Sequence, residues 1–254
     1  MITDPLFYLF AVPAVLIVGI SKGGFGGGLG LIAVPMLALT VPPTQAAAIM
    51  LPILCVMDLF ALWGFRKSVD KKNLMILLPA AAFGIVLGAL SFHQLSESLL
   101  LLMIGLLAVL FSLHWVWQTL SRITPKPERR KTHKGLLLGA LAGFTSFSVH
   151  AGGPPLNFYL LPQKLDKTIY AGTTIIFFAT VNYLKLVPYS MLDLLPAGNL
   201  MTSLVLIPLA PIGVKLGIYL HHRINAELFY QFCYMFLFIT GCKLCWEGFN
   251  TFIG

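Results

Sequence analysis

Long apolar runs separated by short polar loops make up most of the chain. The runs lie at 5–20, 27–40, 44–64, 74–92, 98–120, 135–149, 154–162, 168–190, 199–220 and 226–248. Because a membrane-crossing helix needs about 20 residues, most of these runs predict complete spans. The runs 27–40 and 154–162 are too short, and we predict that each forms a broken or re-entrant hairpin with the run before it. The pattern therefore predicts an all-α polytopic membrane protein.

Composition agrees with this prediction and narrows the class of protein. Hydrophobic residues make up 58% of the chain and charged residues 10%, whereas a soluble domain averages about a quarter charged residues. The net charge of +8 comes from basic residues in short loops, so we expect the lipid bilayer as a partner and no nucleic acid. The cysteines lie inside apolar runs, which favours packing over a metal or redox role. They are Cys55, Cys233, Cys242 and Cys245.

The loop charges predict an orientation. Most of the Lys and Arg residues lie in four loops, which follow the runs that end at 64, 120, 162 and 220. The loops 93–97 and 191–198 between them hold Glu97 and Asp193 and no basic residue. The positive-inside rule therefore predicts a protein of the cell (inner) membrane whose basic loops face the cytoplasm. Both termini are then expected on the outer side of that membrane. The N-terminal residues lack the pattern of a cleavable signal peptide.

Two halves of the chain resemble each other. Seven residues of the first half recur in the second half at a constant spacing along the chain. In the first half they are Leu77, Pro79, Ala81, Gly84, Leu87, Gly88 and His93. Their matches, in the same order, are Leu206, Pro208, Ala210, Gly213, Leu216, Gly217 and His222. The loop with His93 is expected outside and the loop with His222 inside, so the halves would be inverted. We expect one transmembrane domain, 1–254, with repeat one at about 5–120, a cytoplasmic linker at about 121–134 and repeat two at about 135–250. Inverted repeats with paired short segments are typical of secondary transporters with a site near the midplane.

Two glycine-containing breaks lie at matching places in the halves. They read SKGGFGGGLGLIAVP from Ser21 to Pro35 and SVHAGGPPLNFYLLP from Ser148 to Pro162. At membrane depth, such a break exposes backbone N–H groups, which survive only inside protein or beside a watery cavity. A half-helix that starts near Gly27 would direct its positive end at that cavity, and Lys22 would add a full charge. This combination predicts an anion site between the breaks.

The candidate substrate-binding residues of the two breaks are backbone donors and the side chains of Lys22 and His150, of which His150 is a possible donor or proton carrier. The donors are the N–H groups near Gly26, Gly27, Gly28, Gly152 and Gly153. Alternatively, these glycines only permit close helix packing. Lys22 and His150 occupy nearly matching positions. Lys22 would otherwise reach the headgroups, and His150 would otherwise only bond to a neighbouring helix.

Asp58 and Lys185 occupy equivalent positions inside two apolar helices. Ionisable residues there are costly and mark functional sites, so we assign these two to the central site or to a gate. Asn182 lies one turn before Lys185 on the same helix face. We expect Asn182 to line the cavity with Thr173, Thr174 and Asn157; the alternative is that these four only link helices.

Several stretches resemble one family. GGFGGGLGLIAVPMLAL, the small residues Ala46–Ala48, AGGPPLNFYLLP and AGTT (Ala171–Thr174) resemble the sulfite exporter TauE/SafE family of membrane permeases. The second motif has Pro154 and Pro155 where more glycine is common. This resemblance implies transport of a small sulfur oxyanion or an organosulfonate, in either direction.

We therefore expect a secondary transporter that moves sulfite or an alkyl or aryl sulfonate by alternating access. An anion channel, or a permease for another small organic anion, is the alternative. No HExxH or GxSxG motif and no clustered carboxylate pair is present, so we expect no enzyme and no metal. The aromatic residues around the second break, including Phe158 and Phe178, would suit a substrate with an apolar body if they line the cavity.

The coupling ion is expected to be H⁺ rather than Na⁺, and no cofactor is expected. Asp58 is the only carboxylate deep inside an apolar run, and no second one is present to help form a sodium site. Asp58 would carry the proton unless it is a permanent ion-pair partner of a lysine, and His150 is the alternative carrier. Direction of transport and oligomeric state are open at this point.

Overall fold

The computed structural model describes residues 1–24, 30–65, 68–94, 96–121, 129–220 and 226–253. The described residues form helices and no strand. In chain order the elements are α1 (Pro5–Gly24), η1 (Gly30–Ile32), α2 (Ala33–Leu37), α3 (Pro43–Phe65), α4 (Lys71–Ser91), η2 (Phe92–Gln94), α5 (Glu97–Ser121), α6 (Thr132–Val149), α7 (Gly153–Leu160), η3 (Leu161–Gln163), α8 (Lys167–Met191), α9 (Ala197–Leu206), α10 (Leu209–Leu220) and α11 (Ala226–Ile253). The all-helical class predicted from the apolar runs is confirmed.

The helices follow the predicted runs to within a few residues, with one difference. The run 199–220 is divided into α9 and α10, and Pro208 lies in the turn between them. Proline lacks a backbone N–H and clashes with the preceding turn, which explains the interruption. Its sequence match Pro79 is accommodated inside α4.

Six helical stretches of the described chain are long and apolar enough to cross a membrane. They are Pro5–Gly23, Pro43–Trp63, Lys71–Ser91, Ser98–Ser121, Thr168–Met191 and Ala197–Leu220. The last stretch combines α9 and α10. The short helices α2 and α7 coincide with the two runs that are too short to span.

Side chains and prolines at the helix starts explain where several helices begin. Asp70 accepts a hydrogen bond from the backbone N–H of Asn73 at 3.1 Å and so caps α4. Asp166 caps α8 by accepting from the N–H groups of Thr168 (2.9 Å) and Ile169 (3.4 Å). These carboxylates satisfy donors that have no partner inside the helix. Pro43 occupies the first turn of α3, where a missing N–H does no harm.

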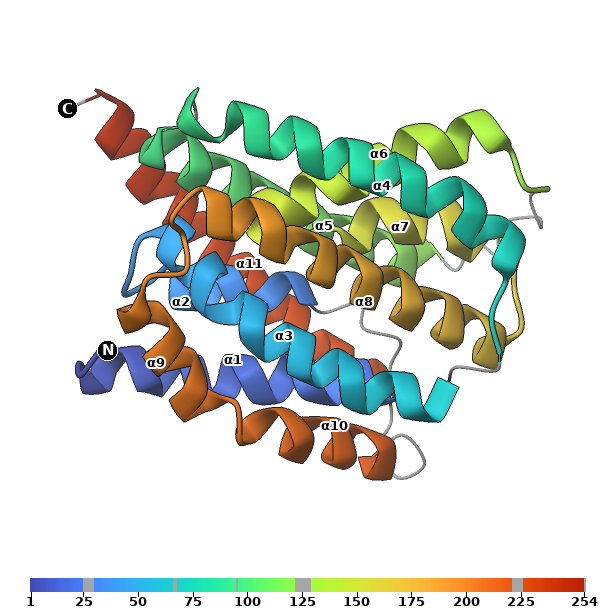
Figure 1. Ribbon diagram of the computed structural model, residues 1–254, viewed down its shortest axis with the longest axis horizontal. Helices are drawn as coiled ribbons and strands as arrows, with labels where there is room; N and C mark the ends of the chain where they lie inside the picture. The colour runs from blue at the N-terminus through green and yellow to red at the C-terminus, as the bar shows by residue number, and fades with distance from the viewer. Residues whose placement is uncertain (25–29, 66–67, 95, 122–128, 221–225, 254) are drawn as a thin grey trace.

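Helices of the first half of the chain pack against helices of the second half (Figure 1). α1 packs along α10, α4 along α6, α5 along α11, and α3 along α8. Glycines allow very close contact in two of these pairs. A Cβ at Gly143 of α6 would lie 2.0 Å from the carbonyl oxygen of Ala81 in α4, and one at Gly23 of α1 would lie 2.1 Å from that of Val214 in α10.

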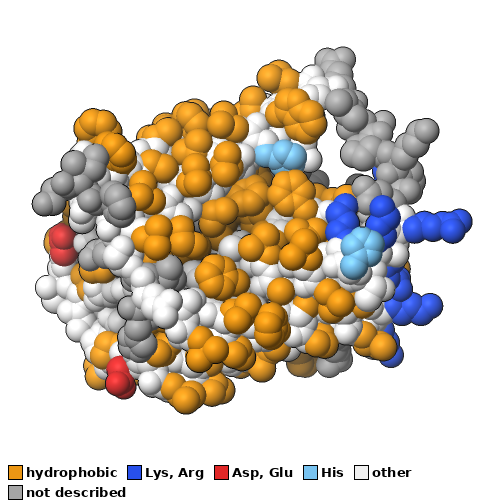
Figure 2. Space-filling view, turned by 90° about the horizontal axis from the view of Figure 1, so that it is seen from above, with side chains coloured by type: hydrophobic (Ala, Val, Ile, Leu, Met, Phe, Trp, Pro, Cys, Tyr) orange, Lys and Arg blue, Asp and Glu red, His pale blue; other side chains and the backbone are white. Residues whose placement is uncertain are grey.

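The outer surface of the helix bundle is apolar, as expected for a protein surrounded by lipid. Large hydrophobic side chains such as Trp63, Met75 and Leu120 are more than 70% exposed. Figure 2 shows Lys and Arg gathered at one end of the long axis and Asp and Glu at the other. The N-terminus and the end of α11 both lie at the end away from the basic cluster (Figure 1). The elements thus form a multi-pass membrane protein with two chemically different ends.

Candidate functional site

Lys22 lies in the last turn of α1, where the first glycine break begins. Its side chain is 6% exposed, and its ammonium forms an ion pair with Asp58 of α3. The same nitrogen lies 3.5 Å from the carbonyl oxygen of Leu54, one turn earlier in α3. Lys22 therefore does not reach the headgroups but points into the protein. Gly26, Gly27 and Gly28, which we predicted to donate to the substrate, lie outside the described residues.

Asp58 joins the two halves of the chain. One carboxylate oxygen bonds to Lys22, and the other accepts a hydrogen bond of 2.6 Å from the side-chain amide of Asn182 in α8. Asp58 is 1% exposed and Asn182 3% exposed. Both oxygens of this buried carboxylate thus have partners, as a buried charge requires.

A second polar cluster surrounds Lys185 of α8, which is fully buried. Its Nζ lies 3.0 Å from both the carbonyl oxygen and the hydroxyl oxygen of Ser146, and 2.7 Å from Nδ1 of His150. A lysine ammonium carries three N–H donors, so the three acceptors use all of them. In the described chain Lys185 forms no ion pair, and its charge is held by neutral groups.

The hydrogen bonds of His150 determine which of its nitrogens carries the proton. Nε2 lies 2.9 Å from the carbonyl oxygen of Ala47 in α3. A carbonyl oxygen only accepts, so Nε2 donates to it and Nδ1 accepts from Lys185. The imidazole is therefore neutral in this arrangement and connects α3 with α8.

The backbone at His150 is left-handed, with φ of 55°, and it ends α6. The turn is closed by hydrogen bonds of 3.1 Å from His150 N–H to Ser146 O and from Ala151 N–H to Thr145 O. A left-handed conformation is unfavourable by about 1–2 kcal/mol for a residue with a Cβ. The two side-chain contacts of His150 offset this cost and hold the ring in place. The chain then reverses into α7, which begins at Gly153.

Both breaks contribute to one small cavity beside these clusters. Its lining residues are Lys22, Gly30, Leu54, Ser146, His150, Gly153, Phe178 and Asn182. Its volume of about 20 Å³ has room for about one water molecule. A Cβ at Gly30 would meet nothing within 4 Å, so this glycine borders open space. A Cβ at Gly152 would lie 2.7 Å from Ala142 O, so Gly152 also permits close packing against α6.

When both lysines are protonated, the site carries one more positive than negative charge. Lys22 and Lys185 then accompany a single carboxylate, that of Asp58, and His150 is neutral in its hydrogen-bonding arrangement. Backbone N–H groups of Gly152 and Gly153 make no hydrogen bond in the described structure. Positive charge and free donors at one buried place are suited to an anion. Within the described residues, no group of three His, Cys, Asp or Glu side chains could hold a metal.

The structure does not bring all the predicted residues to this cavity. Thr173 lies near the start of α8, where its hydroxyl accepts from Asp70 N–H at 2.9 Å and donates to Ile169 O at 2.6 Å. Thr174 donates to Ala171 O at 2.9 Å. Asn157 accepts from the hydroxyl of Tyr170 at 2.7 Å and lines a different, larger pocket.

Sequence reasoning missed Ser146 and Ala47. Ser146 lies four residues before His150 and therefore on the same face of α6, a spacing that would have indicated it. Ala47 contributes only its backbone oxygen, which no side-chain pattern marks. Phe178, which we considered only as a neighbour of the second break, lines the cavity.

Comparisons with known proteins identify the family. Comparisons with curated proteins and with solved structures returned no match to this chain. The family described as "Sulfite exporter TauE/SafE" matches residues 11–244, a range that includes both breaks, Asp58 and Lys185. Because the match extends over nearly the whole chain, this protein belongs to the TauE/SafE family of membrane transporters.

Proposed function

We propose that this protein is a secondary transporter of the inner membrane that moves sulfite or an alkyl or aryl sulfonate. The observation that carries the proposal is a buried site in which two lysines, Lys22 and Lys185, accompany one carboxylate, Asp58. A lysine at the bilayer centre costs about 2.5–3.5 kcal/mol on insertion scales. An anion in the adjacent cavity would offset that cost. A sulfonate is permanently anionic, so it needs N–H or O–H donors and positive charge but no acid.

The helix packing supports two inverted repeats. α4 of the first half packs on α6 of the second, and α10 of the second packs on α1 of the first. The matched pairs α5–α11 and α3–α8 each pack on one another. A two-fold relation between the halves would produce this pattern of helix packing. In this scheme α2 and α7 are the re-entrant segments, and the basic end faces the cytoplasm.

Alternating access suits the small size of the central cavity. A volume of about 20 Å³ does not hold a sulfonate, so the helices have to separate before the substrate binds. A channel would instead need a continuous pore. The closed arrangement therefore favours a transporter over an anion channel.

The contacts of Asp58 support proton coupling at the Lys185–His150 pair rather than at Asp58 itself. Both oxygens of Asp58 are occupied by Lys22 and Asn182, which makes it a structural ion-pair partner. Lys185 and His150 share a 2.7 Å contact next to the cavity, and a second proton there would add a second charge. Inward movement of an anion costs about 2.3 kcal/mol per charge per 100 mV, so uptake would need such a co-transported proton.

Counterflow of radiolabelled sulfite into proteoliposomes tests this function. We expect saturable counterflow with the wild-type protein, inhibited by methanesulfonate. Lys185→Met should reduce the rate at least about tenfold, equivalent to about 1.4 kcal/mol. Lys243→Met is the matched control, because Lys243 is 54% exposed on α11 and pairs with Glu247 at 3.4 Å. Flux that does not saturate would indicate a channel, and equal rates in both variants would contradict the proposed site.

A further inference from the structure

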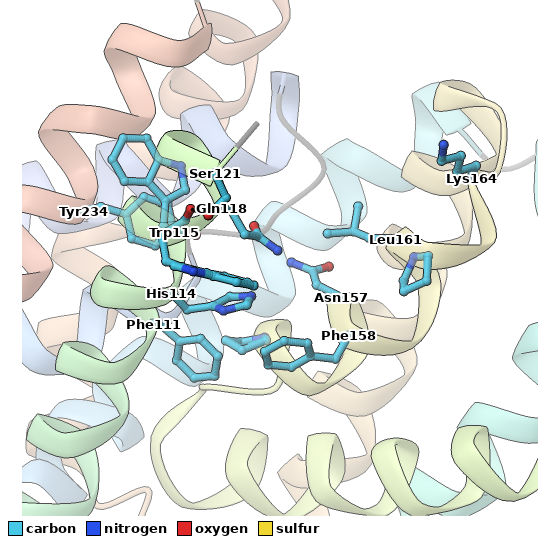
Figure 3. Close-up of a pocket in the computed structure, with 13 residues that line it drawn as sticks. Phe111, His114, Trp115, Gln118, Ser121, Asn157, Phe158, Leu161, Lys164 and Tyr234 are labelled. Carbon is cyan, nitrogen blue, oxygen red and sulfur yellow. Dashed lines mark hydrogen bonds between the residues drawn. The ribbon is translucent and has the colours of Figure 1, made fainter. Parts of the chain in front are cut away.

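A second, much larger pocket lies beside the central site. Its volume is about 380 Å³, within the usual range for small-molecule sites. The second half of α5, the segment α7–η3 and Tyr234 of α11 form its walls (Figure 3). We call it the α5–α7 pocket. None of the functions assigned above uses it.

The walls of the α5–α7 pocket are flat aromatic rings. Trp115 stacks on Tyr234, with ring centroids 5.0 Å apart and planes within 13°. On the other side the ring of Phe158 lies 5.0 Å from His114. Parallel and tilted rings of this kind suit a flat apolar body that stacks between them.

The polar side chains of the pocket offer hydrogen-bond donors. Asn157 uses its amide oxygen to accept from Tyr170, so its amide nitrogen is left for the pocket. Figure 3 shows this nitrogen and that of Gln118 pointing toward one another. A sulfonate oxygen placed between the two amides could accept from both Asn157 and Gln118. Lys164 adds a positive charge, and among the described lining residues none is Asp or Glu.

The first turn of α7 separates this pocket from the central cavity. Gly153 lines the central cavity, and the next residue, Pro154, lines the α5–α7 pocket. The pocket continues along α7 and η3 to Lys164, close to the basic end of the molecule. A molecule bound there would lie between Lys164 and the first turn of α7, which borders the central cavity.

We infer that the α5–α7 pocket is a second binding site, which holds an aryl sulfonate beside the central site before or after transport. The inference rests on the proposed function and adds that the apolar body of the substrate has its own aromatic site. An anionic phospholipid is the competing occupant, because Trp117 and Leu161 at the pocket are exposed to lipid. An acyl chain offers no acceptor to the amides of Gln118 and Asn157, whereas a compact sulfonate does.

Binding of 1-naphthalenesulfonate to the full-length protein in phosphatidylcholine nanodiscs tests the inference. A Trp63→Phe/Trp246→Phe background leaves Trp115 and Trp117 as fluorescent reporters at the pocket. We expect saturable quenching that Phe158→Ala and Gln118→Leu each weaken at least about fivefold, since each removes a direct contact. Phe83→Ala, which changes an aromatic residue 60% exposed on α4, should have no effect. The neutral methyl naphthyl sulfone should bind at least about tenfold more weakly.

Two further measurements separate this inference from the proposed function. In Lys185→Met, naphthalenesulfonate should still quench the tryptophans although sulfite counterflow is lost. In Phe158→Ala, sulfite counterflow should persist. No quenching in the wild type, or equal quenching in all variants, would overturn the second site and leave the central one standing. Quenching abolished by adding phosphatidylglycerol at a low molar fraction would identify a lipid site and also overturn the inference.

Discussion

Asn73 of α4 donates a 2.9 Å hydrogen bond to the side-chain oxygen of Gln163, which ends η3 in the other half of the chain. Asn199 of α9, which like Asn73 begins an Asn-Leu-Met sequence, accepts a 3.0 Å hydrogen bond from Gln45 of α3. The two amide contacts lie at opposite ends of the molecule, since α4 starts at the basic end and α9 at the other (Figure 1). Each contact joins the two halves where an alternating-access protein would have to open.

We predict that removing these amide contacts shifts the protein toward opposite open states. Gln163→Met should favour opening at the basic end and Gln45→Met opening at the other end. One neutral hydrogen bond is worth about 1 kcal/mol, so each shift should be about fivefold. Gly30→Cys in a cysteine-free background is the reporter, because a Cβ there meets nothing within 4 Å.

Membrane-impermeant maleimide, applied from each side in turn, measures the two openings. In Gln163→Met, labelling at position 30 should rise when the maleimide is applied at the basic end. In Gln45→Met, it should rise when the maleimide is applied at the opposite end. If both variants change labelling from the same side, the amide contacts are not gates. Leu200→Met, a change on the exposed side of α9, is the control.

The Lys22–Asp58 ion pair should contribute to stability only as a pair. Asp58→Asn leaves a buried ammonium without its carboxylate, and we expect a loss of about 3–5 kcal/mol in the free energy of unfolding. The double variant Lys22→Met/Asp58→Leu should recover most of that loss. Unfolding of the detergent-purified protein in graded sodium dodecyl sulfate gives the comparison.

Lys243→Met, which removes a largely exposed pair with Glu247, should change stability by less than about 1 kcal/mol. Should the double variant be as unstable as Asp58→Asn alone, an unpaired charge would not be the cause of the loss.

Two glycine-to-alanine changes should differ sharply in their effect. Gly143→Ala would place a Cβ 2.0 Å from Ala81 O, in the tight contact between α4 and α6, and should cost more than about 2 kcal/mol of stability. Gly30→Ala meets open space and should leave thermal stability unchanged. Gly30→Val would occupy the central cavity with a small side chain, so we expect a folded protein that no longer binds sulfite in a calorimetric titration. Sulfite binding by that variant would contradict the location of the site.

If protons couple at the Lys185–His150 pair, a change at His150 should abolish stimulation by a proton gradient without abolishing transport. His150→Asn keeps a residue that tolerates φ of 55° but removes the ring nitrogen next to Lys185. We expect this variant to carry sulfite down a sulfite gradient and to lose stimulation by an imposed pH gradient in liposomes.

The comparison with Asp58→Asn decides which residue couples. If Asp58→Asn alone removes the response to the pH gradient while His150→Asn retains it, Asp58 carries the proton. Accumulation of sulfite with a sodium gradient alone would contradict proton coupling altogether.

The positions of the helices were predictable because their causes are local. A run of apolar residues with polar ends has to form a helix in lipid, where every backbone group needs an internal partner. The predicted run 154–162 corresponds to α7–η3, Gly153–Gln163, and the predicted run 44–64 corresponds to α3, Pro43–Phe65. The division at Pro208 was not predictable, because its match Pro79 lies inside a continuous helix and only the packing around each proline distinguishes them.

The residue types of the central site were also visible in the sequence, since an ionisable side chain in an apolar helix is rare. Lys22, Asp58, His150 and Lys185 were all candidates before their contacts were known. Thr173 was a candidate as well, yet it lies nine residues before Asn182 in α8. Nine residues span about 14 Å of helix, which separates Thr173 from the cavity.

Only the tertiary structure decided how these residues pair. The sequence by itself identified two lysines, a carboxylate and a histidine as ionisable residues within apolar segments or breaks. It could not determine that Asp58 bonds to Lys22 rather than Lys185, or that His150 accepts from Lys185 and donates to Ala47 O. Such contacts join residues 35 or more positions apart. They depend on the rotation and depth of whole helices, which are set by close packing such as that of Gly143 on α4 and Gly23 on α10.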